Sequence, residues 1–483
     1  MGITNGQDFI TRLNNLNNEI WLDGQRVEGL LSEHPAFKGI IKSKAALYDL
    51  QYDESLKDIM TFISPTSGAR VGVSYLQPKT KEDLIKRRKM IEQWAKHSNG
   101  IMGRSPDYLN TVLMSFASSA SLLEGEENCF ANHLRALYER ATDYDLSFTH
   151  TFISPQVNRS QVHLPNSKEP IAAKVVKTTD DGIVIKGARL LATQGGLTDE
   201  VLVFSVPKML IDDDEAFAFS IPSNTDGLKF ICRDSYVGGD SFFNHPLSSQ
   251  FEEMDSIVVF DDVFVPWERV FYYNNVKIAE SFVPQSSFHN FANHQVLTRQ
   301  IVKTEFILGL AELLIQTINI REYPHIQEKM SEIIVGLETM KALIEKAEND
   351  AKLDSFGIMR PNLMPLQVAS IIFPKMYPRF IEIIQLIGAS GMISLPTENA
   401  FHSTIRPQLD QYLQGAFIPA DERVKIFRLA WDLTMSAFGT RQTQYERFFY
   451  GDPVRIASSL YKFYPKKDYV NSVRSFLSLN EED

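Results

Sequence analysis

The sequence changes its pattern at Ile257-Val-Val-Phe-Asp-Asp-Val-Phe-Val-Pro-Trp-Glu-Arg-Val270. The β-branched and aromatic residues of this segment predict a strand, and Pro266 and Trp267 predict a hinge where the strand ends. Before it, short runs of the same composition alternate with turn residues, and Asp180-Asp181-Gly182 predicts a hairpin turn. After it, long amphipathic runs predict helices. We therefore expect the segment to lead from a β-domain into a helical bundle.

Three zones follow from this change. Residues 1–148 predict a helical domain, with a helix start at Ser105-Pro106-Asp107, because serine caps helices and proline suits their first position. Residues 149–275 predict a β-barrel or sandwich. Residues 276–483 predict a helical bundle with a tail, including helices over His294–Ile318 and Asp421–Phe438. This segregated order indicates an α+β fold rather than alternating β–α–β units.

Composition and charge exclude several classes of function. The 483 residues carry a net charge of −11, which disfavours nucleic-acid binding. The most apolar run, Phe306–Ile315, is too short to span a bilayer, so we expect no membrane association. Only Cys129 and Cys232 are present, without a CxxC pair, and no signal peptide is visible. We expect a cytoplasmic protein without a disulfide framework, a zinc ribbon or an iron–sulfur cluster.

Two kinds of binding motif are also missing from the sequence. No GxGxxG follows a predicted strand and no Walker A motif occurs, so the chain shows no site of its own for NAD(P)H phosphates. Flavin redox chemistry in this chain would therefore need electrons from another protein. No HExxH motif or other histidine pair has convincing metal spacing, and we expect no metal site.

The segment Met102-Gly-Arg-Ser-Pro-Asp-Tyr108 combines a helix start with chemically active side chains. Arg104 precedes the predicted cap and Tyr108 falls in the first turn, so both can point at a ligand beyond the helix N-terminus. A guanidinium and a positive helix end favour an anionic oxygen such as a phenolate. The alternative is that Arg104 caps an acidic neighbour and Tyr108 packs in the core.

His150 lies where the helical zone meets the β-zone, and ligand clefts often form at such junctions. Its imidazole could hydrogen-bond a substrate hydroxyl, although a lone histidine is more often structural. Gln156, Asn158 and Arg159 offer polar contacts to a flavin ring or phosphate. Thr193 precedes the Gly-rich turn Gln194-Gly-Gly, where its hydroxyl is available to a ligand unless this is a plain hairpin edge.

Over nearly its whole length the chain resembles the oxygenase component of the 4-hydroxyphenylacetate 3-hydroxylase family. The resemblance rests on the combination of Gly103-Arg-Ser-Pro-Asp-Tyr108, Thr149-His-Thr-Phe-Ile-Ser-Pro-Gln-Val-Asn-Arg159 and Tyr445-Glu-Arg with Gly451-Asp-Pro-Val-Arg455. The Phe260-Asp-Asp-Val-Phe-Val-Pro266 strand resembles the wider acyl-CoA-dehydrogenase superfamily. The resemblance implies the acyl-CoA-dehydrogenase-like fold, with flavin between the β-domain and the C-terminal bundle.

The resemblance also implies a reaction. A separate NAD(P)H-flavin reductase supplies reduced FAD, which diffuses to this chain and reacts with O2 to form a hydroperoxide at flavin C4a. The ring carbon ortho to the oxygen of a 4-substituted phenol attacks the distal oxygen. The expected substrate is 4-hydroxyphenylacetate, and the expected product is 3,4-dihydroxyphenylacetate.

Residue roles follow from the same resemblance. Arg104, Tyr108 and His150 bind the phenol oxygen and favour its phenolate form, and Thr193 bonds near flavin N5. Ser205 and Val206 contact the carboxylate tail of the substrate, although we would expect a second polar residue at 206. The residues expected to line FAD are His150, Thr151, Phe152, Gln156, Val157, Asn158, Arg159, Asp452, Pro453, Val454 and Arg455.

We also expect the chain to form an oligomer, and three rival functions remain open. The apolar stripes of the C-terminal helices suit a core, but the superfamily's tetramers bury similar helices between subunits, so we expect a homotetramer. A CoA-ester dehydratase resembling 4-hydroxybutyryl-CoA dehydratase would need several cysteines for an iron–sulfur cluster. An acyl-CoA dehydrogenase would need a glutamate base and tightly held oxidised FAD. A non-enzymatic helical interaction protein is the third alternative.

Overall fold

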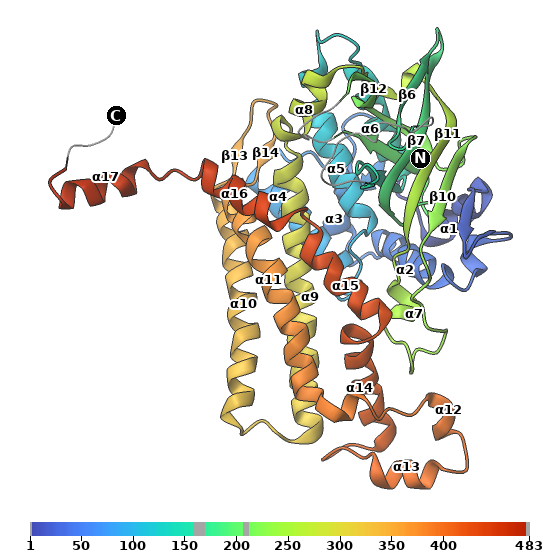
Figure 1. The fold of residues 1–483 in the computed structure, drawn as a ribbon, viewed down its shortest axis with the longest axis vertical. Helices are drawn as coiled ribbons and strands as arrows, with labels where there is room; N and C mark the ends of the chain where they lie inside the picture. The colour runs from blue at the N-terminus through green and yellow to red at the C-terminus, as the bar shows by residue number, and fades with distance from the viewer. Residues whose placement is uncertain (1, 158–169, 206–211, 480–483) are drawn as a thin grey trace.

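A computed structural model describes residues 2–157, 170–205 and 212–479. Its elements fall into the three predicted zones: helices first, then strands, then long helices (Figure 1). The α+β class and the acyl-CoA-dehydrogenase-like order of zones are confirmed. The boundaries at 148/149 and 275/276 remain predictions. Across the described ranges, no helix combines the length and apolar character needed to cross a membrane.

The first zone is mostly helical. Its helices are α1 (Gly6–Leu16), α2 (Lys38–Asp49), α3 (Lys57–Met60), α4 (Lys81–His97), α5 (Pro106–Ser118) and α6 (Ala131–Tyr144). The predicted start of α5 at Pro106 is confirmed, but Ser105 makes no side-chain capping bond. Its hydroxyl donates to the Asp107 carboxylate, and Gln295 of the C-terminal zone donates to the same carboxylate. The first turn of α5 is therefore tied to the bundle.

Two sheets form the middle zone. The six-stranded sheet has the order β2 (Gln25–Arg26), β1 (Ile20–Leu22), β10 (Leu228–Cys232), β11 (Asp255–Pro266), β7 (Gly182–Thr193) and β6 (Lys174–Thr178). The four-stranded sheet has the order β12 (Val270–Tyr273), β9 (Phe217–Pro222), β8 (Glu200–Phe204) and β5 (Phe148–Thr151). Phe219 and Phe260 meet edge to face with centroids 6.1 Å apart, so the sheets pack as a sandwich.

Two features of the sheets differ from the sequence expectation, and a third, the 180–182 turn, agrees with it. The strand predicted from Ile257 begins at Asp255 and leads through β12 before the helices start. The 180–182 turn joins the antiparallel strands β6 and β7, as predicted. Strands β1 and β2 come from the helical zone, and β1 adds parallel to β10. Such short strands lack a recognisable local pattern, because long-range pairing stabilises them.

The third zone is a bundle of long helices with a projecting tail (Figure 1). Its main helices are α8 (Val276–Gln285), α9 (Phe288–Ile318), α10 (Pro324–Asn349), α11 (Leu363–Gly388), α14 (Ala420–Thr434) and α15 (Ala437–Phe448). The short α12 (Glu398–Phe401) and α13 (Arg406–Tyr412) lie between α11 and α14, and α16 (Pro453–Phe463) and α17 (Lys467–Phe476) form the tail. The single helix predicted over Asp421–Phe438 is wrong, because Ser436 starts α15 by accepting a bond from Gly439 N.

Small hairpins complete the chain, and one core joins the zones. The hairpins pair β3 (Thr61–Ile63) with β4 (Arg70–Gly72) and β13 (Lys352–Leu353) with β14 (Met359–Arg360). A single hydrophobic cluster includes Trp94 of α4, Phe260 of β11 and Phe373 of α11. A second cluster surrounds α5 and includes Tyr108, Phe204 of β8 and Phe282 of α8. The start of α5 therefore lies where all three zones meet.

Candidate active site

Arg104 lies between aromatic faces just before α5. Its guanidinium carbon is 4.2 Å from the ring centre of Tyr108 and 4.4 Å from that of Phe449. Its Nη1 donates to the Tyr445 hydroxyl at 2.9 Å, whereas its buried Nε has no partner among the described residues. No carboxylate of the described chain pairs with the guanidinium. The contacts of the Arg104 side chain therefore do not support the alternative that it pairs with an acidic neighbour.

Tyr108 and His150 complete a cluster with Arg104. The Tyr108 and His150 rings meet edge to face at 5.8 Å, and His150 also contacts Phe152 at 5.1 Å and Phe204 at 5.8 Å. Both residues are buried, and Tyr108 belongs to the core as the alternative anticipated. Nδ1 of His150 has no hydrogen-bond partner in the described part of the chain. The structure thus brings together the three residues that the sequence singled out.

The electrostatics of this cluster favour a bound anion. Burial, and then the Arg104 charge, hold the pKa of His150 well below its usual range, so the imidazole is neutral at pH 7. Burial raises the pKa of Tyr108, and Arg104 opposes that rise. A cation that pairs with no carboxylate of the described residues, beside a neutral imidazole and a neutral phenol, suits an anionic oxygen with hydrogen-bonding neighbours.

Thr193 ends β7 close to this cluster. Its hydroxyl donates to Oδ1 of Asp255 at 2.8 Å, which leaves the hydroxyl oxygen as an acceptor. Gln194 follows with φ of 60°, an uncommon value for a residue with a side chain. Its Nε2 donates to the Arg104 carbonyl at 3.0 Å and to Glu253 at 2.9 Å, and its Oε1 is buried without a partner within the described ranges.

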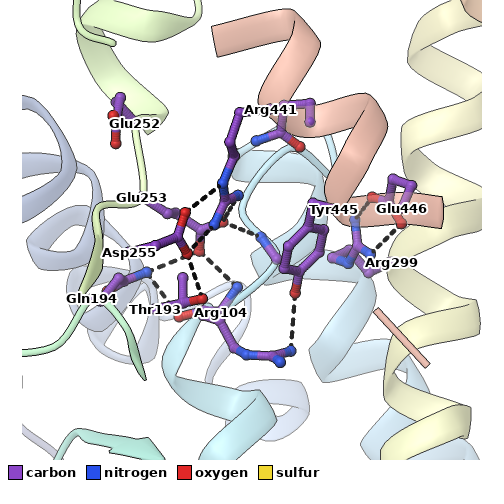
Figure 2. Close-up of polar contacts among 12 residues, drawn as sticks. Arg104, Thr193, Gln194, Glu252, Glu253, Asp255, Arg299, Arg441, Tyr445 and Glu446 are labelled. Atoms are coloured by element: carbon purple, nitrogen blue, oxygen red, sulfur yellow. Dashed lines mark hydrogen bonds and ion pairs between the residues drawn. The ribbon is translucent and has the colours of Figure 1, made fainter. Parts of the chain in front are cut away.

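A charged network that the sequence did not reveal surrounds these residues (Figure 2). Arg441 of α15 binds Asp255 of β11 through two hydrogen bonds, of 2.9 and 2.6 Å. Although burial acts in the opposite direction, the positive charge of Arg441 holds the pKa of Asp255 well below its usual range. Glu253 accepts bonds from the backbone of Gly103 and Arg104. These contacts cross zone boundaries, so no local motif could have indicated them.

A second buried network fixes α15 against α9. Glu446 accepts two bonds from Arg299, of 2.7 and 3.0 Å, and one from Lys303 at 2.8 Å. All three side chains are almost fully buried. Burial lowers the pKa of Lys303 to about 8, although Glu446 opposes the shift. The network holds α15 in register and thereby places the adjacent Tyr445 beside Arg104.

The residues expected to line FAD lie in different surroundings. Phe152 is partly buried and stacks on Phe204 at 5.2 Å beside His150. The buried hydroxyl of Thr151 donates to the Leu190 carbonyl and so links β5 to β7. Gln156 and Val157 are exposed. Asn158 and Arg159 lie outside the described residues.

The C-terminal part of the expected FAD set lies at the start of the tail. Asp452, Pro453, Val454 and Arg455 are exposed at the N-terminus of α16, where Asp452 caps the helix by accepting a bond from Val454 N. Within one chain these four residues do not form a buried pocket. One residue, Gly451, separates them from Phe449 and Tyr450, which pack beside Tyr108 and Gln300 respectively.

The residues expected at the substrate tail are only partly described. Ser205 is buried, and its hydroxyl donates to the carbonyls of Glu215 and Phe217 at 2.7 and 3.3 Å. It follows Phe204, whose ring contacts His150. Val206 lies outside the described residues. Ser205 is therefore near the cluster, with its hydroxyl proton engaged by the backbone.

Comparisons with known proteins identify the family of this chain. The family model for the 4-hydroxyphenylacetate 3-hydroxylase N terminal matches residues 5–272, and the model for its C terminal matches residues 279–478. The chain is 65% identical over 482 residues to a probable 4-hydroxyphenylacetate 3-monooxygenase of Bacillus subtilis, covering 100% of both chains.

Solved structures extend the comparison. The chain is similar to the oxygenase component of 4-hydroxyphenylacetate 3-monooxygenase complexed with FAD and 4-hydroxyphenylacetate, at 45% identity, 98% coverage of both chains and a TM-score of 0.93. A 4-hydroxybutyryl-CoA dehydratase from N. maritimus shares the fold alone, at 18% identity, a TM-score of 0.89 and coverage of 100% of this chain and 96% of that one. The chain belongs to the 4-hydroxyphenylacetate 3-hydroxylase family.

Proposed function

We propose that this chain is the oxygenase component of a two-component monooxygenase. It hydroxylates 4-hydroxyphenylacetate ortho to the phenol oxygen to give 3,4-dihydroxyphenylacetate, using O2 and reduced FAD from a separate NAD(P)H-flavin reductase. The observation that carries the proposal is the Arg104 guanidinium, which lies between two aromatic rings and beside a neutral His150 and pairs with no carboxylate in the described part of the chain. The names of the relatives support the same substrate and cofactor.

Arg104, Tyr108 and His150 act on the phenol oxygen. Arg104 supplies a positive charge that lowers the pKa of a bound phenol, and the phenolate releases electron density into the ring. The ring carbon ortho to the oxygen then becomes a better nucleophile. Tyr108 and His150 supply hydrogen bonds and fix the orientation of the ring, and such positioning accounts for a large part of enzymatic rate enhancement.

The residues present fit a flavin. Nδ1 of His150 and Oε1 of Gln194 are buried polar atoms that lack partners among the described residues, and the Thr193 oxygen can still accept a bond. Reduced FAD, when bound, supplies the electrons that activate O2. Thr193, His150 and Phe152 would lie at its ring, and Gln156–Arg159 and Asp452–Arg455 would contact the rest. Phe204 and Phe449 would exclude water, which protects a reactive oxygen species from decay.

A homotetramer belongs to the same proposal. On α17, Tyr469, Val473 and Phe476 recur at helical spacing and are exposed, Phe476 by 87%. Figure 1 shows this helix projecting from the body of the chain. A neighbouring subunit would cover this apolar stripe and would bring other surfaces to Asp452–Arg455 at the root of the tail. A cytoplasmic location is also proposed, supported by the free thiols of Cys129 and Cys232.

A reconstituted assay tests the proposal. The purified protein should be nearly colourless, and it should form 3,4-dihydroxyphenylacetate only when an independent flavin reductase, NAD(P)H and FAD are all added. A stably yellow protein that reduces acyl-CoA-dependent dyes would instead identify an acyl-CoA dehydrogenase. Product formation without any reductase would contradict the division of labour between two proteins.

A further inference from the structure

The Glu253 carboxylate holds the backbone on which Arg104 stands. Its Oε2 accepts a bond from Gly103 N at 2.8 Å, and its Oε1 accepts bonds from Arg104 N at 2.6 Å and Gln194 Nε2 at 2.9 Å. The side chain is fully buried. Glu253 comes from the loop before β11, whereas Gly103 and Arg104 come from the helical zone. One carboxylate therefore fixes Arg104 relative to the β-domain.

Gln194 extends this contact to the other side of the site. Its amide group bridges Glu253 and the Arg104 carbonyl, and its backbone N–H donates to the Met254 carbonyl at 2.6 Å. These bonds hold Gln194 at its unusual φ of 60°, and strain of this kind persists only where surrounding contacts enforce it. Thr193, the residue expected at the flavin, is the preceding residue. Glu253 and Gln194 thus connect Arg104, expected at the phenol, to Thr193, expected at the flavin; Figure 2 shows these four side chains together.

Tyr445 of the C-terminal zone contacts both Gly103 and Arg104. An added Cβ on Gly103 would lie 2.4 Å from the Tyr445 hydroxyl, so only glycine allows this ring to approach. The same hydroxyl accepts the bond from Arg104 Nη1. Arg441, one turn earlier on α15, lies 3.6 Å from Glu253 Oε2 and binds Asp255. Each zone of the fold therefore contributes to the placement of Arg104.

We propose that Glu253 is a positioning residue for the hydroxylation, and this inference rests on the proposed function. It aligns the phenol held by Arg104 with the flavin held near Thr193, so that oxygen is transferred to the ring instead of being released as hydrogen peroxide. Misplacement of the ring by about 1 Å can cost a hundredfold in rate. Glu253 itself touches neither reactant, and its effect passes through Arg104 and Gln194.

The substitution Glu253→Gln tests the proposal with little change of shape. An amide has one acceptor oxygen and one NH2 donor, so at least one of the Gly103 and Arg104 N–H groups would face another donor. The ratio of 3,4-dihydroxyphenylacetate formed to O2 consumed should fall about tenfold, with a matching rise in hydrogen peroxide. Deuterium uptake by the amides of residues 101–105 should accelerate, which reports the loosened backbone without reference to catalysis.

Glu252→Gln is the matched control. Glu252 is the neighbouring residue and is equally buried, but its carboxylate binds Arg233 at 2.6 Å and Tyr236 N at 3.0 Å and lies away from Arg104 in Figure 2. This variant should keep the wild-type product ratio and the slow exchange at 101–105. If Glu253→Gln retains the wild-type ratio, or Glu252→Gln loses it equally, Glu253 is not a positioning residue.

A second variant tests the proposal even if Glu253→Gln does not fold. Gln194→Asn keeps a residue that tolerates positive φ but is one methylene too short to bridge Glu253 and the Arg104 carbonyl. It should shift products towards hydrogen peroxide in the same direction, and a wild-type ratio in this variant would overturn the inference. If the wild-type protein forms no hydroxylated product, the proposed function fails before any variant is compared.

Discussion

Arg104 lies between two aromatic rings and donates to one hydroxyl. Each cation–π contact contributes about 0.5–2 kcal/mol, whereas removing an ion from water costs several kcal/mol. The guanidinium is half-buried, so these contacts offset only part of the free energy lost by removing its charge from water. A bound anion would offset the rest. This balance is the physical reason for proposing that Arg104, which has no carboxylate partner among the described residues, binds a phenolate. Planarity is as important as charge, because the stacking needs a flat group.

Arg104→Lys tests the importance of planarity. Lysine keeps the charge but cannot stack between Tyr108 and Phe449 while donating to Tyr445, so kcat/KM for 4-hydroxyphenylacetate should fall by about a hundredfold or more. Arg135→Lys, at an exposed arginine paired with Glu124, is the control and should keep full activity. Steady-state kinetics with excess reductase makes the comparison. Similar kinetics for both variants would rule out stacking as the basis of phenolate binding.

The lowered pKa of His150 should make the stability of the protein depend on pH. Its pKa is lowered in the folded state, so as pH falls below about 6.5 the unfolded chain takes up a proton that the folded chain refuses. The free energy of unfolding should therefore decrease as pH drops, and His150→Gln should flatten this decrease. Urea unfolding of both proteins between about pH 5 and pH 7.5 measures the difference.

Asp145 makes the free energy of unfolding depend on pH in the opposite direction. Burial raises its pKa to about 6, so its contribution to stability is greatest at low pH and is lost as pH rises through that value. The substitution at 150 leaves Asp145 unchanged, so the difference between the two proteins isolates the histidine. Parallel pH profiles would show that the imidazole titrates normally.

Local sequence predicted the residues that stand at element boundaries. Arg104 and Tyr108 were identified because Ser105-Pro106-Asp107 has the chemistry of a helix start, and His150 because it follows the last helix of its zone. Glu253, Asp255 and Arg441 could not be predicted in this way. Their partners lie up to 186 residues away, and a carboxylate without a motif carries no local signal.

At the scale of elements, the pairing of α9 with α15 determines where the C-terminal zone meets the site. Arg299 and Lys303 of α9 share Glu446 of α15, and all are buried. Tyr445 is the neighbour of Glu446 and binds Arg104. The long helices could be predicted from periodicity, and α9 ends at Ile318 as expected. The side-chain network between them depends on tertiary packing, which periodicity does not report.

Glu446→Ala tests the energy of this pairing. The substitution leaves Arg299 and Lys303 buried without a counter-charge, so the free energy of unfolding should fall by about 3–5 kcal/mol. Glu332→Ala, which breaks the exposed pair with Arg379 on α11, is the control and should have a much smaller effect. Chemical denaturation measures both variants. Equal losses would mean that the buried network has no special role in stability.

At the scale of the whole molecule, the tail is a part whose apolar side chains a single chain leaves exposed. The apolar side chains of α17 are exposed, and the helix lies away from the body in Figure 1. The order of the three zones could be predicted, because each has its own periodicity. The contribution of β1 and β2 to the large sheet could not, since a three-residue strand is stabilised only by its partner.

Truncation after Pro465 tests the role of the tail in assembly. Sedimentation should show a tetramer for the full chain and smaller species for the truncated chain. The circular dichroism and thermal midpoint of the remaining structure should change little, because α17 has no buried residue and contributes none to the main hydrophobic cluster of the described residues. A tetramer that survives truncation would place the main interface elsewhere, and a monomeric full chain would contradict the assembly altogether.

We propose that Arg104, Tyr108 and His150 hold a phenol for hydroxylation by O2 at the expense of reduced FAD. A single-turnover reaction tests it most directly: protein, chemically reduced FAD and 4-hydroxyphenylacetate are mixed with ¹⁸O2, and the product is analysed by mass spectrometry. The wild type should give 3,4-dihydroxyphenylacetate with one ¹⁸O atom, and a folded Arg104→Ala variant should give hydrogen peroxide without hydroxylated product. Labelled product from that variant at the wild-type yield would contradict the claim.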